Sequence, residues 1–416
     1  MNGGNAFRRP LSTTERMYFP MRELAPPFLM QLVVPGEGHI DPQRLRRAVA
    51  AAAEVTPGAR LRRQGAWWVD SGVAPTVQVV DDHLLRSPAL ESDTVLTAPM
   101  SPGTTMEVLL LTAAPVTLIF RVFHGVMDGV GMLAWATNVL RALRGDDPVP
   151  HTDPVADQEL VARLGATGKP TPMVPRYRSA VGRGRQRRGS ARHLLRHRRV
   201  AAAGPGALAR VCALLAAETP GTSRIMMPVD LRRHDPALRS TANLALPLFL
   251  DIAPGQDWMH VKNQIKTGLA ARSELDQLAN TRITLVPDPV NRTVLRTTNW
   301  LGARAGRNLA SATVSHMGRF RADDLAVPGF RPTGLFVLPQ HSVAMPLLFG
   351  LTEFDGHTEL TVSARNGTGI EPRLETLLDR ITQMLESEPP VRRHHDDRHV
   401  HEDRPTRLSW RRGHHR

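Results

Sequence analysis

The 416-residue sequence predicts an α/β protein built from two layered units, and three observations support this fold class. Residues 116–123 are rich in β-branched and aromatic side chains, which is typical of a buried strand. Residues 128–144 continue with helical periodicity, so they predict a largely buried helix that is capped by Asp128 and ends at Gly145. A second series of predicted strands and helices fills residues 201–385.

The N-terminal unit, residues 1–150, begins with the capping-box pattern Ser12-x-x-Glu15, which predicts a short helix. Asp41 and Pro42 open a second helix with one apolar face. Alternating or apolar segments predict strands over residues 28–34, 59–61, 67–70, 75–80 and 106–111. This order of elements, which ends at the apolar strand and its helix, is typical of an α/β layer domain.

The C-terminal unit is expected over residues 201–388. Periodicity predicts helices over residues 201–217, 258–278, 293–309 and 371–385. Strands are expected over residues 223–229, 242–252, 312–317, 334–339, 345–352 and 359–363, the last four in a second sheet. Residues 151–200, which are rich in Pro, Gly and Arg, are interpreted as a linker, and residues 389–416 as a disordered basic tail rich in His and Arg.

The net charge of +14 belongs to two segments. Residues 176–199 contain ten Arg and no acidic residue, and residues 391–416 contribute +4, so the rest of the chain is neutral. The Arg tract, residues 176–199, is either a solvated crossing between the units or a patch for phosphate, carried by coenzyme A, a phosphopantetheinyl carrier or nucleic acid. Tyr177 is its one aromatic residue, which gives little support for base stacking, so no specific nucleic acid is expected.

Several classes of protein and site are excluded or disfavoured. The single cysteine, Cys212, excludes an internal disulfide and a cysteine-based metal site, and no metal site is predicted. No signal peptide is evident, and no uncharged apolar run approaches the ~20 residues that a membrane span needs, so we expect a cytoplasmic protein. Neither a phosphate-binding Gly-rich loop nor a Gly-x-Ser-x-Gly elbow is present. The Arg and Ala content suggests a bacterial genome of high GC content.

The turn between the apolar strand and its helix reads His124-Gly-Val-Met-Asp128-Gly129. A histidine held in one orientation can take a proton from a hydroxyl or amine as it attacks an acyl carbon. Gly129 permits a tight turn and close approach of a substrate. Local chemistry leaves two interpretations open, since His124 is either this base or a buried histidine bonded to the main chain, with Asp128 only capping the helix.

His124-x-x-x-Asp128-Gly129 after a hydrophobic strand resembles the active-site motif of the condensation-domain and chloramphenicol acetyltransferase superfamily. Three further segments are similar to that family and follow in its order: residues 11–15, residues 227–232 with Asn243, and residues 313–318. Two positions differ. Phe123 stands where many members have a first histidine, and His316 replaces the usual asparagine.

The resemblance implies two chloramphenicol acetyltransferase-like lobes, each a mixed sheet with flanking helices, that form a V with a central tunnel. His124 would lie in the tunnel as general base, with Asp128 and Gly129 completing the catalytic motif. Asp128 would order the turn through a structural ion pair with Arg232. Ser315 and His316 would contact the substrate.

The function implied is acyl transfer from a coenzyme A or carrier-protein thioester to a hydroxyl or amine, in bacterial secondary metabolite or lipid biosynthesis. The thioester is a co-substrate, no cofactor is bound, and we expect a monomer whose partners are the acyl thioester, a small-molecule acceptor and an acyl or peptidyl carrier protein. Two alternatives stay open: a catalytically silent condensation-like scaffold that binds carrier proteins, and a basic nucleic-acid-associated protein.

Overall fold

The computed structural model describes residues 7–84, 89–166, 168–186, 191–201, 203–278, 288–342 and 344–387. The predicted tail, residues 389–416, lies outside the described residues. Among the described helices, none is both long enough and apolar enough to cross a membrane.

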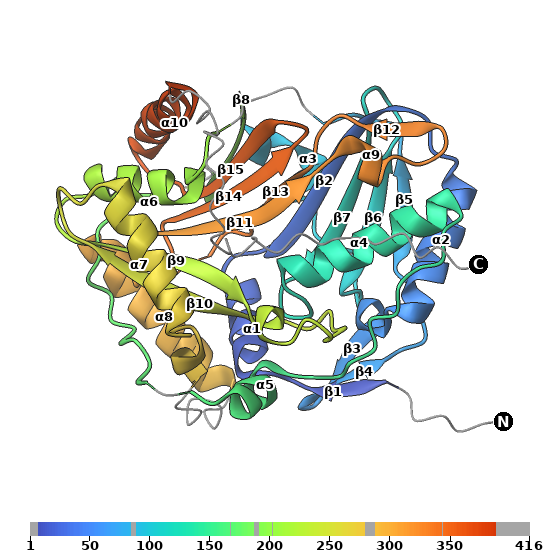
Figure 1. The fold of residues 1–416 in the computed structure, drawn as a ribbon, viewed down its shortest axis with the longest axis horizontal. Coiled ribbons are helices and arrows are strands. Elements are labelled where there is room, and N and C mark those ends of the chain that lie inside the picture. Colours follow the sequence, from blue (N-terminus) through green and yellow to red (C-terminus); the bar gives the residue numbers. More distant parts are fainter. Residues whose placement is uncertain are drawn as a thin grey trace, which may run out of the picture.

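The N-terminal lobe is built on a six-stranded sheet in the order β12-β2-β7-β6-β5, with β13 also paired to β2 (Figure 1). Only β5 and β6 run parallel to each other, so the sheet is mixed. Its strands are β2 (Leu29–Gly38), β5 (Thr76–Val80), β6 (Met106–Leu111), β7 (Val116–Phe123), β12 (Phe330–Pro332) and β13 (Phe336–Leu338). A small separate sheet holds β1 (Arg8–Pro10), β3 (Leu61–Gln64) and β4 (Trp67–Asp70).

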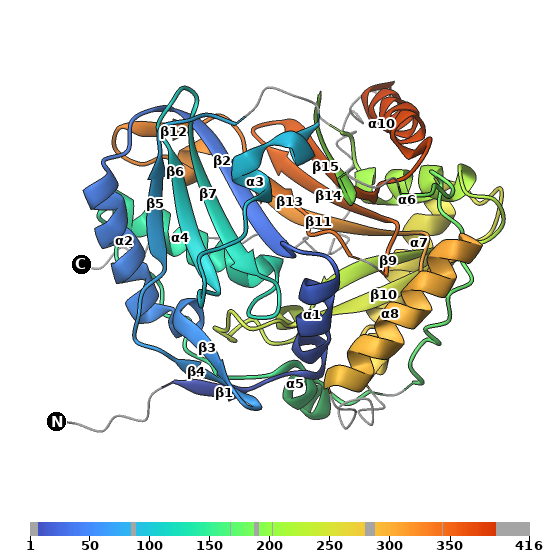
Figure 2. The same ribbon diagram turned by 180° about the vertical axis from the view of Figure 1, so that it is seen from behind.

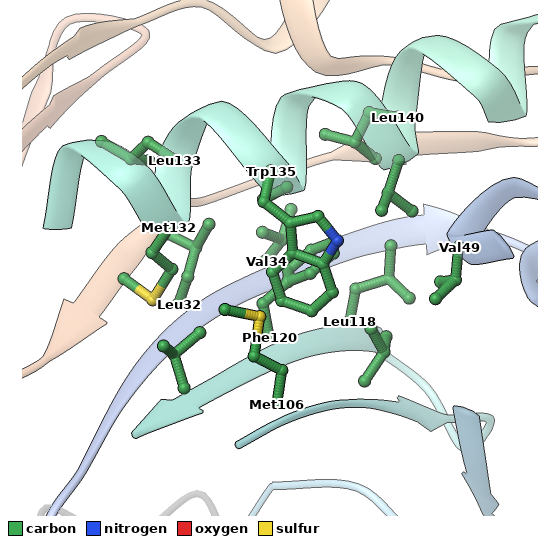
Figure 3. Close-up of a cluster of buried hydrophobic side chains, with 14 of the residues drawn as sticks. Leu32, Val34, Val49, Met106, Leu118, Phe120, Met132, Leu133, Trp135 and Leu140 are labelled. Carbon is green, nitrogen blue, oxygen red and sulfur yellow. The ribbon is translucent and has the colours of Figure 1, made fainter. Parts of the chain in front are cut away.

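The core of this lobe lies between the sheet and two helices, α2 (Pro42–Val55) and α4 (Gly129–Arg144). Figure 3 shows Trp135 of α4 at its centre, over Phe120 and Leu118 of β7. The Trp135 ring meets that of Phe120 edge-on, with centroids 5.4 Å apart. The predicted strand and helix are therefore both present, and their packing fixes the ends of the turn that carries His124.

The C-terminal lobe holds a second six-stranded sheet in the order β10-β9-β11-β14-β15-β8 (Figures 1 and 2). In it β11 runs parallel to both neighbours and the other pairs are antiparallel. The strands are β8 (His193–Ala201), β9 (Ser223–Asp230), β10 (Ala245–Ile252), β11 (Ala312–Phe320), β14 (Leu347–Phe354) and β15 (His357–Arg365). Three helices build the core beside it: α6 (Ala207–Ala217), α7 (Trp258–Ala270) and α10 (Ile370–Ser387).

Helix α1 (Thr13–Leu24) lies in the middle of the molecule in both views (Figures 1 and 2). The predicted capping box opens it: Ser12 accepts from the main-chain N–H of Glu15, whose carboxylate accepts from the N–H of Ser12. It packs against α8 (Asp288–Ala305) and α5 (Asp157–Leu164). The short helices are α3 (Thr94–Thr97) and α9 (Ala322–Leu325).

The chain crosses from one lobe to the other and back, which corrects one prediction. Residues 334–339 are expected in the second sheet, whereas β13 pairs with β2 of the first, Phe336 opposite Val33. Phe336 and Leu338 fill a buried apolar cluster on the face of that sheet turned away from α4. Because strand pairing depends on partners about 300 residues apart, periodicity predicts the strand and not the sheet that it joins.

The interpretation of residues 151–200 as a flexible crossing is wrong for its last part. Residues 193–201 form β8, an edge strand paired with β15, and the helix expected from residue 201 begins only at Ala207. Arg196 is almost fully buried and bonds to three carboxylates, those of Glu91, Glu371 and Glu375. Three carboxylates that lie far away in the sequence thus neutralise an arginine of the tract, which composition does not reveal.

The fold class is the predicted one, two mixed sheets with flanking helices. Cys212 lies fully buried on α6, as the sequence indicates. The V shape and the central tunnel stay predictions.

Candidate active site

His124 follows the last residue of β7, in a turn closed by the hydrogen bond from the Val126 N–H to the Phe123 carbonyl. Its Nδ1 lies 3.1 Å from the carbonyl oxygen of Met127. A carbonyl only accepts, so Nδ1 carries the proton and donates to it. Nε2 is then the unprotonated nitrogen, and it forms no hydrogen bond with any described residue. The turn therefore holds the tautomer that a general base requires.

The ring of Tyr18, on α1, stacks on the imidazole with centroids 4.4 Å apart and an angle of 20° between the planes. Burial lowers the pKa of His124 below its ordinary value, although the Met127 carbonyl and the charge of Asp128 act in the opposite direction. His124 is therefore neutral near pH 7, with a lone pair available on Nε2.

Asn243 reaches the same turn from the C-terminal lobe. Its Nδ2 donates to the main-chain carbonyl of His124 at 2.6 Å. Its Oδ1 is buried without a hydrogen-bond partner among the described residues. The amide that carries this unused acceptor has its Nδ2 3.4 Å from Nδ1 of the imidazole.

Asp128 accepts four hydrogen bonds, three of which come from the C-terminal lobe. Oδ1 accepts from the N–H of Gly131, 2.7 Å away, and so caps α4. Oδ2 accepts from the N–H of Leu244, also at 2.7 Å, in the segment before β10. The guanidinium of Arg232 completes the set, with Nη1 3.0 Å from Oδ2 and Nη2 3.3 Å from Oδ1. The ion pair that the sequence predicts between these residues is present.

Arg232 is itself held on every side. It donates to the carbonyls of Ser240 and Ala242, at 2.8 and 2.7 Å, and to the carboxylate of Asp230 at 2.7 Å. Burial lowers the pKa of Arg232, but the charges of Asp128 and Asp230 outweigh burial and raise it above its ordinary value. The pair is thus a permanently charged connection between the lobes.

The two glycines that open α4 face the C-terminal lobe. A Cβ on Gly131 would lie 2.4 Å from the main-chain oxygen of Thr241, which cannot move aside easily. A Cβ on Gly129 would lie 2.6 Å from the terminal methyl of Met317, the far end of a flexible side chain. Close approach of main chain therefore requires glycine at 131, whereas Gly129 of the motif meets only a side chain.

Phe123, at the position where the resembled family often has a histidine, is fully buried. Its ring meets the ring of Phe19 edge-on, with centroids 5.3 Å apart, and the guanidinium of Arg22 lies 4.5 Å from its centroid. Both partners are on α1, the helix that brings Tyr18 to His124. Phe123 therefore anchors the helix that covers the imidazole.

Ser315 and His316 are neighbours on β11, but their side chains contact different residues. The Ser315 hydroxyl is 3.6 Å from the sulfur of Met317, the side chain that faces Gly129. His316 pairs with Glu353, Nε2 to Oε1 at 3.2 Å. Ser315 thus lies at the contact between Met317 and Gly129, which we call the seam between the lobes. His316 forms an ion pair with a carboxylate of β14.

Solved structures with the same arrangement of elements are numerous. The condensation domain of the Monacolin K polyketide synthase MokA matches with a TM-score of 0.60 and 15% identity, over 92% of this chain and 99% of that one. The starter condensation domain of rhizomide synthetase RzmA matches with a TM-score of 0.61 and 16% identity, over 92% and 96%. Polyketide synthase associated protein 5 from Mycobacterium tuberculosis matches with a TM-score of 0.59 and 16% identity, over 93% and 100%.

The chain has the condensation-domain fold. At 14–16% identity the likeness shows the fold alone. No family model matches the chain, and no curated protein matches it.

Sequence reasoning missed one member of this site of the condensation-domain fold. Tyr18 lies 106 residues before His124, in a helix whose predicted role is only to open the chain. Its position in an amphipathic helix gives no signal of a contact with the motif. Asn243 and Arg232 are both marked by the resemblance, and the structure brings both to the His124 turn.

Proposed function

We propose that the protein is an acyltransferase that moves an acyl group from a coenzyme A or carrier-protein thioester to a hydroxyl or amine. The observation that carries the proposal is the state of His124, whose Nδ1 is fixed on the Met127 carbonyl while Nε2 is neutral and without a partner among the described residues. A base so held needs no reorganisation when the acceptor binds.

The reaction proceeds by direct transfer. Nε2 of His124 takes the proton of the acceptor hydroxyl or amine as its oxygen or nitrogen attacks the thioester carbonyl carbon. The carbon–sulfur bond of the tetrahedral intermediate then breaks, and the departing sulfur takes the proton back from the imidazolium. The products are an ester or amide and a free thiol, and the imidazole returns to its starting state.

The fold supports the thioester donor. One matching structure, the RzmA starter condensation domain in mutant form, is described in complex with C8-CoA and Leu-SNAC. Ser315 is proposed to face the acyl group, since it lies beside Met317 at the seam. His316 is proposed to contact substrate only when its pair with Glu353 opens.

Release of free thiol from a panel of acyl-coenzyme A donors tests the proposal, with wild type compared with His124→Ala. The matched control is His260→Ala, because His260 is an exposed histidine of α7 that bonds only to the side chains of Gln256 and Gln264 and to the cap of its own helix. We expect thiol release by wild type and the control and its loss in His124→Ala. Equal release by all three proteins would remove His124 as the base.

If none of the three proteins releases thiol from the coenzyme A donors, the assay is repeated with the same acyl groups loaded on a carrier protein. No release with either type of donor would contradict the proposal and favour the scaffold that the sequence leaves open.

A further inference from the structure

A cluster of two arginine and two histidine side chains lies where β8 begins and β15 ends. His193 and Arg365 are opposite each other in these antiparallel strands, which places their side chains on one face. The imidazole of His341, in the segment between β13 and β14, stacks on that of His193 with centroids 5.1 Å apart and planes at 8°. Arg192, which precedes His193 in the chain, is exposed. We call Arg192, His193, His341 and Arg365 the cationic cluster.

Three members of the cluster lack a carboxylate partner in the part of the chain that the structure describes. Among the described residues no carboxylate forms an ion pair with Arg192, His193 or His341. The charge of Glu91 acts on the pKa of His193 and opposes the effect of burial, which lowers that pKa, but the Glu91 carboxylate already binds Arg196 and the N–H of Leu195. The same Arg tract therefore contains one part that protein carboxylates neutralise, at Arg196, and one part that they do not.

The deepest member of the cluster has an unused polar atom. His341 is more than nine-tenths buried, and its Nδ1 has no hydrogen-bond partner among the described residues. Burial and the charges of His193, Arg365 and Arg192 all lower the pKa of His341 well below its ordinary value. A buried imidazole beside arginine side chains, with a ring nitrogen unpaired among the described residues, is the environment that an anionic ligand would stabilise, since its oxygens accept hydrogen bonds from the guanidinium of Arg192 and from the ring N–H groups of His193 and His341.

The position of the cluster relates it to His124. Arg192 donates to the carbonyl of Leu24, the last residue of α1, at 3.2 Å. Leu24 lies six residues, or about 9 Å, beyond Tyr18 along this helix. Tyr18 in turn stacks on His124. The cluster thus lies beside one end of the helix whose middle covers the imidazole.

We propose that the cationic cluster binds the phosphate of a phosphopantetheine-type thioester, with the pantetheine arm running along α1 toward His124. This inference rests on the proposed function and deepens it by assigning the residues that recognise the donor. A pantetheine arm has about as many bonds along its length as the main chain of four residues, so it extends about 14 Å. This length exceeds the distance of about 9 Å between Leu24 and Tyr18 along α1. The adenosine part of coenzyme A is not needed for this contact, so both coenzyme A and a carrier-bound arm present the required group.

Calorimetric binding of four probes to the full chain tests the assignment: pantetheine, 4′-phosphopantetheine, coenzyme A and 3′,5′-ADP. In wild type we expect 4′-phosphopantetheine and coenzyme A to bind at least tenfold more tightly than pantetheine. His193→Gln and Arg192→Gln should reduce this ratio toward one and leave the pantetheine affinity unchanged. The control for Arg192→Gln is Arg46→Gln, which removes the same charge from an exposed site on α2 and should leave the ratio as in wild type.

Each outcome decides something. Equal affinities for pantetheine and 4′-phosphopantetheine in wild type, or a ratio that both cluster variants leave intact, would overturn the assignment. Binding of 3′,5′-ADP that falls in the cluster variants, without a 4′-phosphopantetheine preference, would also overturn it, because the cluster would then recognise the nucleotide phosphates.

Turnover separates this inference from the proposed function. His124-dependent thiol release from a phosphate-free acyl-pantetheine, with no effect of the cluster variants on acyl-coenzyme A, would leave the acyltransferase standing and the phosphate site refuted. Binding of 4′-phosphopantetheine that depends on the cluster, without any thiol release, would support the phosphate site and contradict the acyltransferase.

Discussion

Two imidazoles of this molecule, His124, which is half-buried, and His341, which is buried, have similar aromatic neighbours and different polar ones. His124 stacks on Tyr18 and His341 on His193, and burial lowers the pKa of both. Nδ1 of His124 has a carbonyl partner, and the charge of Asp128 acts on its ring. Nδ1 of His341 has no partner among the described residues, and the charged groups that act on its ring are cations. The polar neighbours, more than the burial, therefore separate the role of base that we propose for His124 from the role in anion binding that we propose for His341.

The largest expected effect separates these two roles. His124→Ala should reduce turnover of acyl-coenzyme A and of acyl-pantetheine alike, by about 10²–10⁴-fold, because the base serves either donor. His193→Gln should reduce only the turnover of acyl-coenzyme A, through KM. Steady-state kinetics with the two donors measures both effects. A loss confined to one donor in His124→Ala would show that the comparison is wrong.

The next effect concerns the charge pair that holds the His124 turn. Asp128→Ala leaves the guanidinium of Arg232 without one of its two carboxylate partners and removes the acceptor of two main-chain N–H groups. We expect the free energy of unfolding to fall by about 3 kcal/mol, as measured by urea denaturation. The control is Glu54→Ala, which removes an exposed partner of Arg60 and should change stability by less than about 0.5 kcal/mol. Equal effects would mean that Asp128 does not hold the lobes together.

A smaller effect distinguishes the two glycines beside the pair. Gly131→Ala forces a methyl against the Thr241 carbonyl and should destabilise by about 2 kcal/mol. Gly129→Ala meets only the end of Met317, so stability should fall by less than about 1 kcal/mol. Thermal unfolding of the two variants side by side measures the difference. A larger loss of stability in Gly129→Ala than in Gly131→Ala would show that the Thr241 carbonyl does not lie as close to residue 131 as in the structure.

The smallest expected effect is a change in pH dependence. Protonated His124 cannot accept a proton, so kcat/KM falls as pH decreases through its pKa, and since burial lowers that pKa the midpoint in wild type lies below 6.5. Tyr18→Ala admits water to the imidazole, raises the pKa toward 6.5 and moves the midpoint to higher pH. Tyr18→Phe keeps the stacked ring and is the control, with a midpoint as in wild type. A common midpoint in all three proteins would show that Tyr18 has no influence on the imidazole.

Much of this site was predictable from local pattern and resemblance. The strand, the turn and the helix that carry His124 and Asp128 follow from a change of periodicity within 30 residues. The pairing of Asp128 with Arg232 follows from the resemblance, and the structure contains it. The stacked ring of Tyr18 has no such signal, because a helix position says nothing about which distant turn it will face.

By itself, the sequence determined the elements around His124, since helix and strand periodicity depend on near neighbours. Only the tertiary structure decided that residues 336–338 complete the N-terminal sheet and that Glu91, Glu371 and Glu375 neutralise Arg196 while His341 lies among cations. The reason is physical. Pairing across a sheet and compensation of charge depend on groups that only folding brings within a few ångströms of each other.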